Sequence, residues 1–364
     1  MKYLDEYRNT ERQKEIITEI QKYSKITKEK INIMEVCGTH TMAIGKYGIR
    51  KLLPKNINLI SGPGCPVCVT PEEYIDTAIE LSKGKDIFIS TFGDMMKVPG
   101  SFSSLEKERG SGAKIFVVYS PLDALKIAEM NKNKKVIFLS IGFETTTPLI
   151  SQTLKIAKEE KIKNFFLLSG NKLIPPVMEF LLNEKDTEID GFICPGHVSA
   201  IIGTEPYIKI SEKFNVSCII SGFEPFDILI SILLILKNIK EGKGKVINEY
   251  KRTVREEGNI KAKKAIYDTF DIVDSEWRGI GIVKDSGLKL NENFSDFDAE
   301  KEFGIKIKIS GRKKSCICGE ILKGKKNPFD CPLFEKVCNP ENPIGPCMVS
   351  SEGTCSAYYK YERK

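Results

Sequence analysis

The residues from Val136 to Pro148, which read VIFLSIGFETTTP, decide the fold class of this chain. The stretch begins with six residues that are apolar apart from one serine and show no alternation of polar and apolar positions. Such a run is typical of a strand buried on both faces of a parallel sheet. A glycine turn follows, and Thr147-Pro148 then gives a typical helix start. The stretch therefore predicts one strand-turn-helix unit.

The same pattern recurs along most of the chain. Seven further apolar runs lie at Ile33–Val36, Ile57–Ile60, Ile87–Ser90, Ile115–Tyr119, Phe165–Leu168, Gly191–Cys194 and Cys218–Ile220. Thr70-Pro71 and Ser120-Pro121 repeat the helix-start signal, and Glu73 predicts a capping box with Thr70. Strands that alternate with helices imply right-handed βαβ units. We therefore expect glycine-rich loops at the carboxyl ends of the strands, where open α/β sheets bind ligands.

The predicted strands divide evenly at about residue 128. The division predicts an α/β fold of two similar domains, each with a parallel four-stranded sheet and helices on both faces, at residues 31–128 and 129–240. Residues 1–30 are expected to form an amphipathic helix that packs on the body. Residues 241–364 depart from the pattern, with Lys/Glu-rich helical spacing at 240–264 and a Cys-rich tail. We expect an α+β iron–sulfur domain there.

Composition limits the classes of function. The 364 residues carry 56 Lys and Arg against 49 Asp and Glu, and a net charge of +7 is weak support for a nucleic-acid partner. The longest apolar stretch, Ile228 to Leu236, is about half of the ~18 residues that span a bilayer. The first residues, MKYLDEYRNTERQKE, are too charged for a signal peptide. We expect a soluble cytoplasmic protein with no membrane and no nucleic-acid partner.

Cys37 and His40 follow the first predicted strand, in the sequence CGTHT. A thiolate and an imidazole at this spacing can hold a soft metal ion or form an activated nucleophile, and the alternative is a buried cysteine beside an incidental histidine. The chain has two histidines, and the second, His197, falls in an equivalent loop of the second half, which favours a functional role. Three carboxylates beside glycine suit a helix cap as well as a ligand contact: Asp94, Glu144 and Glu224.

Cys65 and Cys68 lie in the sequence GPGCPVC, just before the helix predicted at Thr70. A Cys-x-x-Cys pair at a helix N-terminus is a redox arrangement, because the helix dipole stabilises a thiolate and the spacing allows a disulfide. Half of a structural zinc site is the alternative, and no second half lies nearby in the sequence.

Six of the eleven cysteines lie in the tail, at Cys316, Cys318, Cys331, Cys338, Cys347 and Cys355. In a cytosolic protein such a cluster indicates a metal or redox centre. One set of four has the spacing C-x14-C-x6-C-x16-C from Cys316 to Cys355 and leaves Cys318 and Cys347 as a pair. Four thiolates suit an iron–sulfur cluster and two more suit a dithiol. Spacing alone does not select this set of four, and structural zinc is the alternative.

Several motifs together resemble the HypD family of hydrogenase maturation proteins: CGTHT, GPGCPVC, FGDMMKVPGS, GFETTTP, PGHVSAIIG, GFEP and GPCMVSSEGTCSAYYKY. They extend in order from about Cys37 to Tyr361, and several long motifs in order are far more specific than any one. The resemblance implies a cytoplasmic factor that helps to build the Fe(CN)2(CO) unit of [NiFe]-hydrogenases. It would work with a small HypC-type chaperone and accept cyanide from a HypE-type partner.

The resemblance also implies roles for individual residues. Cys37 would hold the mononuclear iron together with a cysteine of the HypC-type chaperone, with His40 beside it. The ligands of a [4Fe–4S] cluster would be Cys316, Cys331, Cys338 and Cys355. The redox thiol pairs would be Cys318 with Cys347 and Cys65 with Cys68.

Two other classes of function remain open. A stand-alone iron–sulfur disulfide reductase acting on a protein partner would use the same tail and the Cys65/Cys68 pair, but it has no use for a mononuclear iron site at Cys37. A zinc-stabilised RNA-binding protein would be colourless, whereas an iron–sulfur protein is brown.

Overall fold

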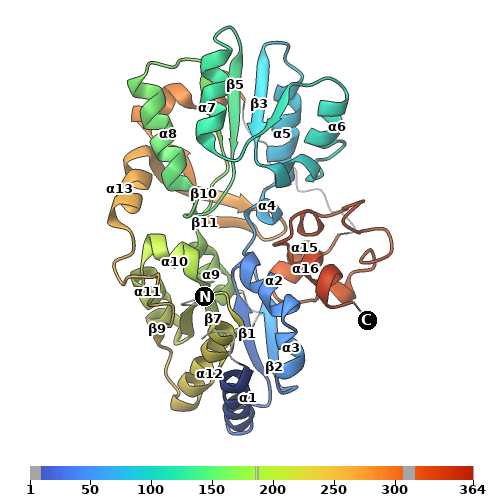
Figure 1. Ribbon diagram of the computed structural model, residues 1–364, viewed down its shortest axis with the longest axis vertical. Helices are drawn as coiled ribbons and strands as arrows, with labels where there is room; N and C mark the ends of the chain where they lie inside the picture. Colours follow the sequence, from blue (N-terminus) through green and yellow to red (C-terminus); the bar gives the residue numbers. More distant parts are fainter. Residues whose placement is uncertain (1–9, 185, 187, 306–315, 364) are drawn as a thin grey trace.

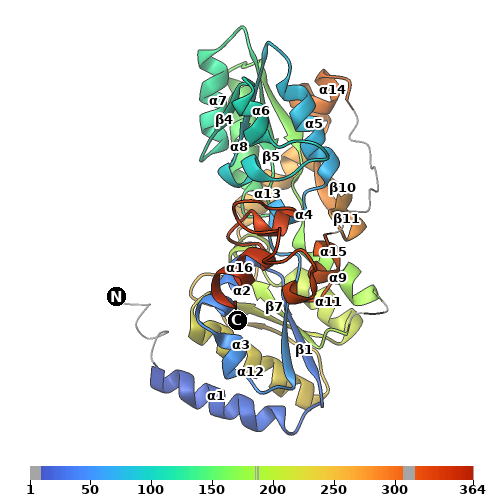
Figure 2. The same cartoon turned by 90° about the vertical axis from the view of Figure 1, so that its right-hand side faces the viewer.

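The computed structural model describes residues 10–184, 186, 188–305 and 316–363. Two α/β lobes lie end to end, and the C-terminal region lies beside their junction (Figure 1). The view turned by 90° places helices α15 (Cys318–Leu322) and α16 (Thr354–Tyr361) between the levels of the two sheets (Figure 2). No helix in the described part of the chain is both long enough and apolar enough to cross a membrane.

Sheet A forms the lower lobe of Figure 1 and has the strand order β2-β1-β7-β8-β9. Its strands all pair in parallel and are β1 (Ile31–Glu35), β2 (Ile57–Ser61), β7 (Gly191–Pro195), β8 (Ser217–Ser221) and β9 (Val246–Asn248). Every residue of the three central strands is buried, as expected for strands covered on both faces.

Sheet B forms the upper lobe and has the order β4-β3-β5-β6. Its strands, also parallel, are β3 (Ile87–Thr91), β4 (Ile115–Val117), β5 (Lys135–Ser140) and β6 (Phe165–Ser169). All eight predicted apolar runs form strands, and the α/β class with parallel sheets is confirmed. Strand β9 was not predicted, because its three residues lie in the Lys/Glu-rich segment that has helical spacing.

The assignment of strands to sheets differs from the sequence prediction. We expected the strands before and after about residue 128 to form separate sheets, but β1 and β2 pair with strands from beyond residue 190. The domain boundary that we expected at about residue 128 falls inside one lobe, between β4 and β5 of sheet B. The chain thus builds two of the five strands of sheet A, then all of sheet B, and then the other three strands of sheet A. A local βα pattern predicts a strand but does not identify its neighbour.

Helices cover both sheets. The upper lobe has α5 (Glu72–Ser82), α6 (Leu105–Gly110), α7 (Pro121–Met130) and α8 (Thr147–Glu159). The lower lobe has α1 (Thr10–Ser24), α2 (Gly38–Lys46), α3 (Ile49–Leu52), α10 (Gly196–Ile202), α11 (Glu205–Phe214) and α12 (Pro225–Glu241). At the junction lie α4 (Pro66–Val69), α9 (Ile174–Asn183) and α13 (Ile260–Thr269). Helix α1 packs on α12 through the buried Ile16 and Ile20.

One predicted helix start is confirmed and another is wrong. Ser120 caps α7, because its Oγ accepts a hydrogen bond from the amide of Leu122 at 3.1 Å. The capping box at Thr70 was wrong: α5 begins at Glu72, and the Thr70 hydroxyl donates to the carbonyl oxygen of Pro66 at 2.9 Å. Thr70 therefore closes the short helix α4 instead of opening α5.

An antiparallel hairpin, β10 (Phe270–Trp277) and β11 (Gly281–Leu290), joins the lobes. Trp277 is fully buried and stacks on Phe143 with ring centroids 5.9 Å apart. The buried Lys172 lies at the carboxyl end of β6, and its Nζ donates to Ser275 Oγ at 2.7 Å and to the carbonyl oxygen of Glu276 at 2.6 Å. Burial lowers the pKa of Lys172 to about 7. The hairpin is thus attached to sheet B through a buried amine.

Short elements complete the C-terminal region. They are the 3-10 helices η3 (Glu292–Phe297), η4 (Pro328–Asp330) and η5 (Pro346–Met348), and the helix α14 (Ala299–Glu302). The expected α+β character of this region fits the hairpin and these helices.

We predict that Lys172→Met flattens the pH dependence of stability above pH 7. The pKa of Lys172 is about 7 in the folded protein and 10.5 ordinarily, so the unfolded chain binds more protons between these values. This group therefore makes the free energy of unfolding rise with pH in that window, by up to ~1.4 kcal/mol per pH unit. Urea unfolding at pH 7 and pH 9 measures the difference. Equal slopes for the variant and the wild type would contradict the assignment.

Candidate functional site

Cys37 lies where β1 ends and α2 begins. The loop that carries Cys37 packs closely against two other segments, the loop at 62–65 and the C-terminal region, and a glycine makes each close approach possible. A methyl group on Gly64 would overlap the backbone nitrogen and Cα of Cys37, and one on Gly38 would overlap Glu352. The amide of Gly38 also donates to the carbonyl oxygen of Gly64 at 3.0 Å. Two missing side chains therefore let the loop at 62–65 and the C-terminal region close over Cys37.

The histidine in contact with the Cys37 sulfur is His197, with 4.0 Å between Sγ and Nε2. His40, which we expected beside the same ion, donates instead from Nε2 to the carbonyl oxygen of Gly222 at 2.8 Å. The ring of Phe223 packs against both imidazoles, with centroids 4.8 Å from His40 and 5.2 Å from His197. From the sequence we placed His197 in a loop of the second half equivalent to the Cys37 loop, without assigning it a role. A role for His40 as a ligand of the metal ion stays a prediction.

Burial controls the protonation of these groups. It raises the pKa of Cys37 to about 12, and the backbone amide of His40 opposes that rise only in part. Burial lowers the pKa of His40 to about 4 and also lowers the pKa of His197. At neutral pH the site therefore holds a thiol and two neutral imidazoles. A thiolate forms there when a metal ion displaces the proton.

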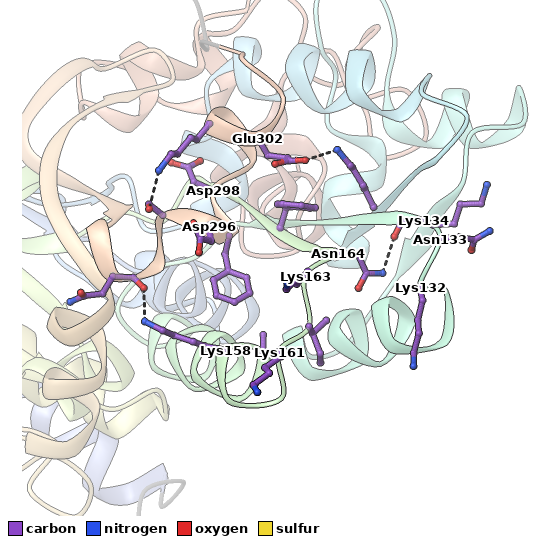
Figure 3. A pocket seen from close by; sticks show the side chains of 18 residues that line it. Lys132, Asn133, Lys134, Lys158, Lys161, Lys163, Asn164, Asp296, Asp298 and Glu302 are labelled. Atoms are coloured by element: carbon purple, nitrogen blue, oxygen red, sulfur yellow. Dashed lines mark hydrogen bonds and ion pairs between the residues drawn. The ribbon is translucent and has the colours of Figure 1, made fainter.

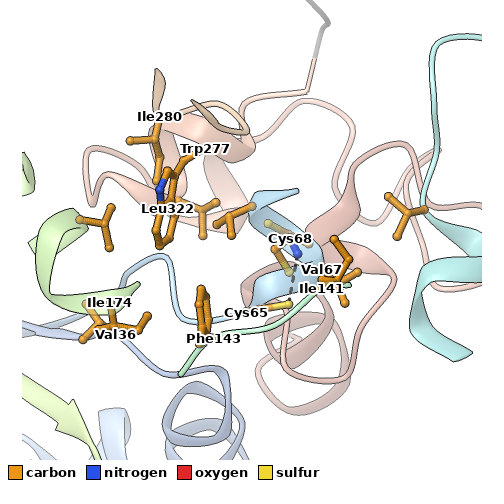
Figure 4. Packing of buried hydrophobic residues seen from close by; sticks show 14 of the residues in the cluster. Val36, Cys65, Val67, Cys68, Ile141, Phe143, Ile174, Trp277, Ile280 and Leu322 are labelled. Carbon is orange, nitrogen blue, oxygen red and sulfur yellow. Dashed lines mark hydrogen bonds between the residues drawn. The ribbon is translucent and has the colours of Figure 1, made fainter. Parts of the chain in front are cut away.

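Cys65 and Cys68 lie at the four-residue helix α4 and not at the longer α5. Cys65 is the N-cap, and its Sγ accepts a hydrogen bond from the amide of Cys68 at 3.3 Å. Figure 4 shows both thiols in the apolar packing at the junction of the lobes. Burial raises the pKa of Cys68 well above its ordinary value. A lowered pKa from the helix dipole, which we expected, is therefore not found for Cys68.

The six tail cysteines line a single pocket, together with the apolar residues Ile321, Leu333, Phe334 and Met348. Cys355 is the second residue of the last helix, and it lies within electrostatic reach of four other tail sulfurs, Cys316, Cys318, Cys331 and Cys338. The fold thus brings together every tail cysteine that the sequence analysis had identified.

Five sulfurs are successive neighbours in the folded chain, and we call this series the thiol row. The Cys68 thiol contacts those of Cys347 and Cys65. Cys347 in turn neighbours Cys318, which neighbours Cys316. The neighbouring thiols of Cys318 and then Cys68 lower the pKa of Cys347. The two pairs expected from the sequence are therefore in contact with each other, and the contact between Cys68 and Cys347 was not predicted.

No three Cys, His, Asp or Glu side chains among the described residues lie close enough together to hold a single metal ion. The tail pocket nevertheless fits a larger iron–sulfur cluster in its chemistry, since its donors are all sulfur and its walls are apolar. The amide of Ile344 also donates to Cys338 Sγ at 3.4 Å, a contact typical of such sites. The choice of four ligands among the six stays a prediction.

The three carboxylates beside glycine have mainly structural surroundings. Glu224 is the N-cap of α12 and forms a capping box with Asp227. Glu144 accepts a hydrogen bond at 3.0 Å from the amide of Ile174, the first residue of α9. Asp94 is exposed in the 3-10 helix Gly93–Lys97. The helix-cap alternative therefore describes Glu224, and Glu144 anchors a helix start.

A separate groove lies at the amino ends of β5 and β6, away from the carboxyl ends where Gly142 and Gly170 follow these strands (Figure 3). It is lined by seven lysines and three acidic residues, and two of the lysines pair with Asp86 and Glu302. It contains no cysteine or histidine. Its side chains carry none of the thiol or imidazole chemistry of the Cys37 site.

Comparison with known proteins identifies the family. The sequence profile described as "HypD: Hydrogenase formation hypA family" matches residues 11–362. The chain belongs to this family. It is 47% identical to a putative hydrogenase expression/formation protein of Methanocaldococcus jannaschii, over 94% of this chain and 96% of that protein. It is also 41% identical to the hydrogenase maturation factor HypD of Escherichia coli, over 100% of this chain and 99% of that protein.

A second bacterial relative supports the same assignment. The hydrogenase maturation factor HypD of Cupriavidus necator is 42% identical, over 100% of this chain and 98% of that protein. The family match includes the Cys37 loop, both thiol pairs and the whole tail pocket.

We predict that Gly64→Ala lowers stability by ~2 kcal/mol or more, because its methyl group would overlap the backbone of Cys37. Gly110→Ala is the matched control, since a methyl group there meets no atom within 4 Å. Thermal unfolding of the two variants measures the effect. An equal midpoint for Gly64→Ala and the wild type would show that the loop is not held against Cys37.

Proposed function

We propose that the protein is a cytoplasmic hydrogenase maturation factor that serves as scaffold and thiol redox centre for assembly of the Fe(CN)2(CO) unit of [NiFe]-hydrogenases. Family membership and the names of the relatives support the role in maturation. The observation that carries the proposal furthest is the thiol row, because it extends from the loop that contacts Cys37 to the pocket of six sulfurs.

Cys37 is the residue that binds the iron substrate in this proposal. Low-spin iron with cyanide and carbon monoxide ligands needs soft donors and open coordination positions. Cys37 supplies one sulfur, and His197 lies 4.0 Å from it. The described residues supply no third donor at this place. A cysteine from the HypC-type chaperone would complete the sulfur ligands, which explains why the scaffold needs a partner.

The tail pocket would hold a [4Fe–4S] cluster on Cys316, Cys331, Cys338 and Cys355. A cluster of this type supplies one-electron chemistry. The residues around it keep water away, because Ile321, Leu333 and Phe334 line the same pocket. Cys318 and Cys347 remain as thiols beside the cluster and in contact with Cys68.

The thiol pairs match the electron count of cyanide transfer. A HypE-type partner would present cyanide as a thiocyanate on its own cysteine. Release of cyanide as HCN, with the partner's sulfur leaving as thiolate, consumes two electrons and one proton. Oxidation of one dithiol to a disulfide supplies two electrons and releases two protons, so one proton is left over. Cys65 with Cys68, or Cys318 with Cys347, can each supply this pair of electrons.

We predict that Cys37→Ala removes the infrared bands of iron-bound cyanide and carbon monoxide from the complex with the HypC-type chaperone. Alanine has no donor atom for iron, while the tail pocket keeps its own ligands, so the visible colour should survive. Cys194→Ala is the control, because Cys194 is a buried thiol of the same sheet whose neighbouring thiol is Cys218. Bands that persist in Cys37→Ala would place the iron elsewhere.

We predict that Cys331→Ala or Cys338→Ala abolishes the visible chromophore of anaerobically purified protein, whereas Cys318→Ala retains it. The reason is that the first two supply cluster ligands and the third belongs to the thiol row. Absorption spectra with iron and sulfide analysis distinguish the variants. Loss of the chromophore in all three variants would show that the ligand set is different, and a colourless wild type with zinc would overturn the iron–sulfur assignment.

A further inference from the structure

We propose that the lysine-lined groove at the amino ends of β5 and β6 is a docking surface for an acidic segment of a partner protein. The groove has a volume of about 900 Å³, which is in the range of established ligand sites. Its side chains come from the loop before β5, from the end of α8 and the loop that follows it, and from the segment between η3 and α14 (Figure 3). The inference goes beyond the proposed function, because none of these residues belongs to the Cys37 site or to the tail pocket.

The groove carries an excess of positive charge. Seven of its lining residues are lysines and three are acidic. Lys134 pairs with Asp86 and Lys135 pairs with Glu302, so two of the seven positive charges are compensated. The other five lysines form no ion pair with another described residue. An anionic ligand would therefore meet several ammonium groups whose charge is not already neutralised.

The five lysines differ in how they are held. Lys158 donates to a backbone carbonyl oxygen at 2.8 Å, and Lys301 donates to a serine hydroxyl at 3.0 Å. These neutral acceptors orient the two ammonium groups without cancelling their charge. The other three lysines are exposed to solvent: Lys132, Lys161 and Lys163. The groove thus combines two oriented cations with three that are free to reach toward a ligand.

The groove is built on a fixed frame. Asn164 directly precedes β6, and its side-chain nitrogen lies within hydrogen-bonding distance of three backbone carbonyl oxygens. The three oxygens belong to Ala128, Asn131 and Lys134, at 2.9, 3.1 and 2.8 Å. These contacts attach the loop that carries Lys132 to the start of the strand. A site whose backbone is fixed beforehand loses little conformational entropy when a ligand binds.

The backbone of Lys161 is an independent sign that the groove needs charge. Its φ angle is 57°, in the left-handed region that favours glycine. Lys161 follows the end of α8, where many helices have a glycine in this conformation. A lysine at this position costs stability that glycine would not cost, and it supplies an ammonium group to the groove.

The side chains of the groove suit an acidic peptide better than a nucleic acid. None of the lining residues is an arginine, the residue that binds phosphate through two parallel hydrogen bonds. Phe166 and Phe297 are only 4% and 7% exposed, so they offer no face on which a base could stack. The three acidic side chains would repel a continuous phosphate backbone, whereas a peptide can place an apolar residue beside them and against Ile162. We therefore expect a segment rich in Asp and Glu that includes apolar residues.

Fluorescence anisotropy of a labelled peptide tests the proposal on the full-length protein. The probe is the octapeptide Glu-Glu-Leu-Glu-Glu-Leu-Glu-Glu with a fluorescein label. The wild type should bind it, and the triple variant Lys132→Glu/Lys161→Glu/Lys163→Glu should bind it about tenfold more weakly or worse, because like charges then face each other. Raising the salt concentration should weaken binding to the wild type, since the attraction is between exposed charges.

The matched control is the triple variant Lys25→Glu/Lys30→Glu/Lys55→Glu. Its three lysines are exposed, belong to the lower lobe and lie outside the groove. The two triple variants have the same net charge, so general attraction between a basic protein and an acidic peptide affects both equally. The control variant should bind the peptide within about twofold of the wild type.

A single substitution separates the charge of the groove from the stability of the fold. Lys161→Gly should weaken peptide binding by about threefold, while the midpoint of thermal unfolding stays the same or rises. The reason is that glycine adopts this backbone conformation without strain. Unchanged affinity together with a lower midpoint would show that Lys161 serves only the fold, which contradicts the proposal.

The remaining outcomes are equally decisive. A wild type that does not bind the peptide overturns the proposal, and so does equal weakening in the two triple variants. A fluorescein-labelled octamer of uridylate tests the other class of ligand: if it binds more tightly than the peptide, and only the groove variant loses that binding, the groove is a nucleic-acid site and the proposal is wrong. None of these measurements depends on the visible chromophore. A colourless protein would therefore refute the proposed cluster and leave these results unchanged.

Discussion

The close approach of Gly64 to the backbone of Cys37 is the contact on which the rest of the site depends. It places the loop that carries Cys65 and Cys68 directly on the Cys37 loop, and it is possible only because residue 64 has no side chain. From that loop the sulfur contacts continue through Cys347 into the tail pocket. One missing methyl group thus allows three chemically distinct parts of the molecule to share one buried interior.

The strands were predictable from the sequence because the strongest signal in this chain is local. Runs such as Val136–Ile141 are apolar on both faces, and burial of both faces occurs only in covered parallel sheets. The neighbours of each strand were not predictable, since β1 has the same local pattern whether it pairs with β3 or with β7. The helix start at Thr70 failed for a related reason: the Cys65 thiol caps an earlier turn that has no strong signal.

The residues of the candidate site were predictable from the sequence, but the contacts between them in the folded chain were not. The spacing of cysteines identified the Cys65/Cys68 pair and the tail cluster, whereas the pairing of Cys318 with Cys347 came from the family resemblance. Contact between Cys68 and Cys347 depends on how the tail packs against helix α4 at the junction of the lobes, and no local sequence pattern encodes that packing. The sequence analysis noted His197 as the second of the two histidines. Its place beside Cys37 was not predictable, because it follows from the pairing of β1 with β7.

The depth of the thiol row limits which reagents can reach its sulfur atoms. Cys65, Cys68, Cys318 and Cys347 are each less than 8% exposed, and Cys316 alone is partly open to solvent. Thiol–disulfide exchange needs direct attack on a sulfur atom, so bulky peptides such as glutathione cannot reach the middle of the row while the tail is packed. The sulfurs in the middle of the row are then shielded from thiols in the surrounding solution. Reagents in solution meet the row first at Cys316, the partly exposed sulfur at one of its ends.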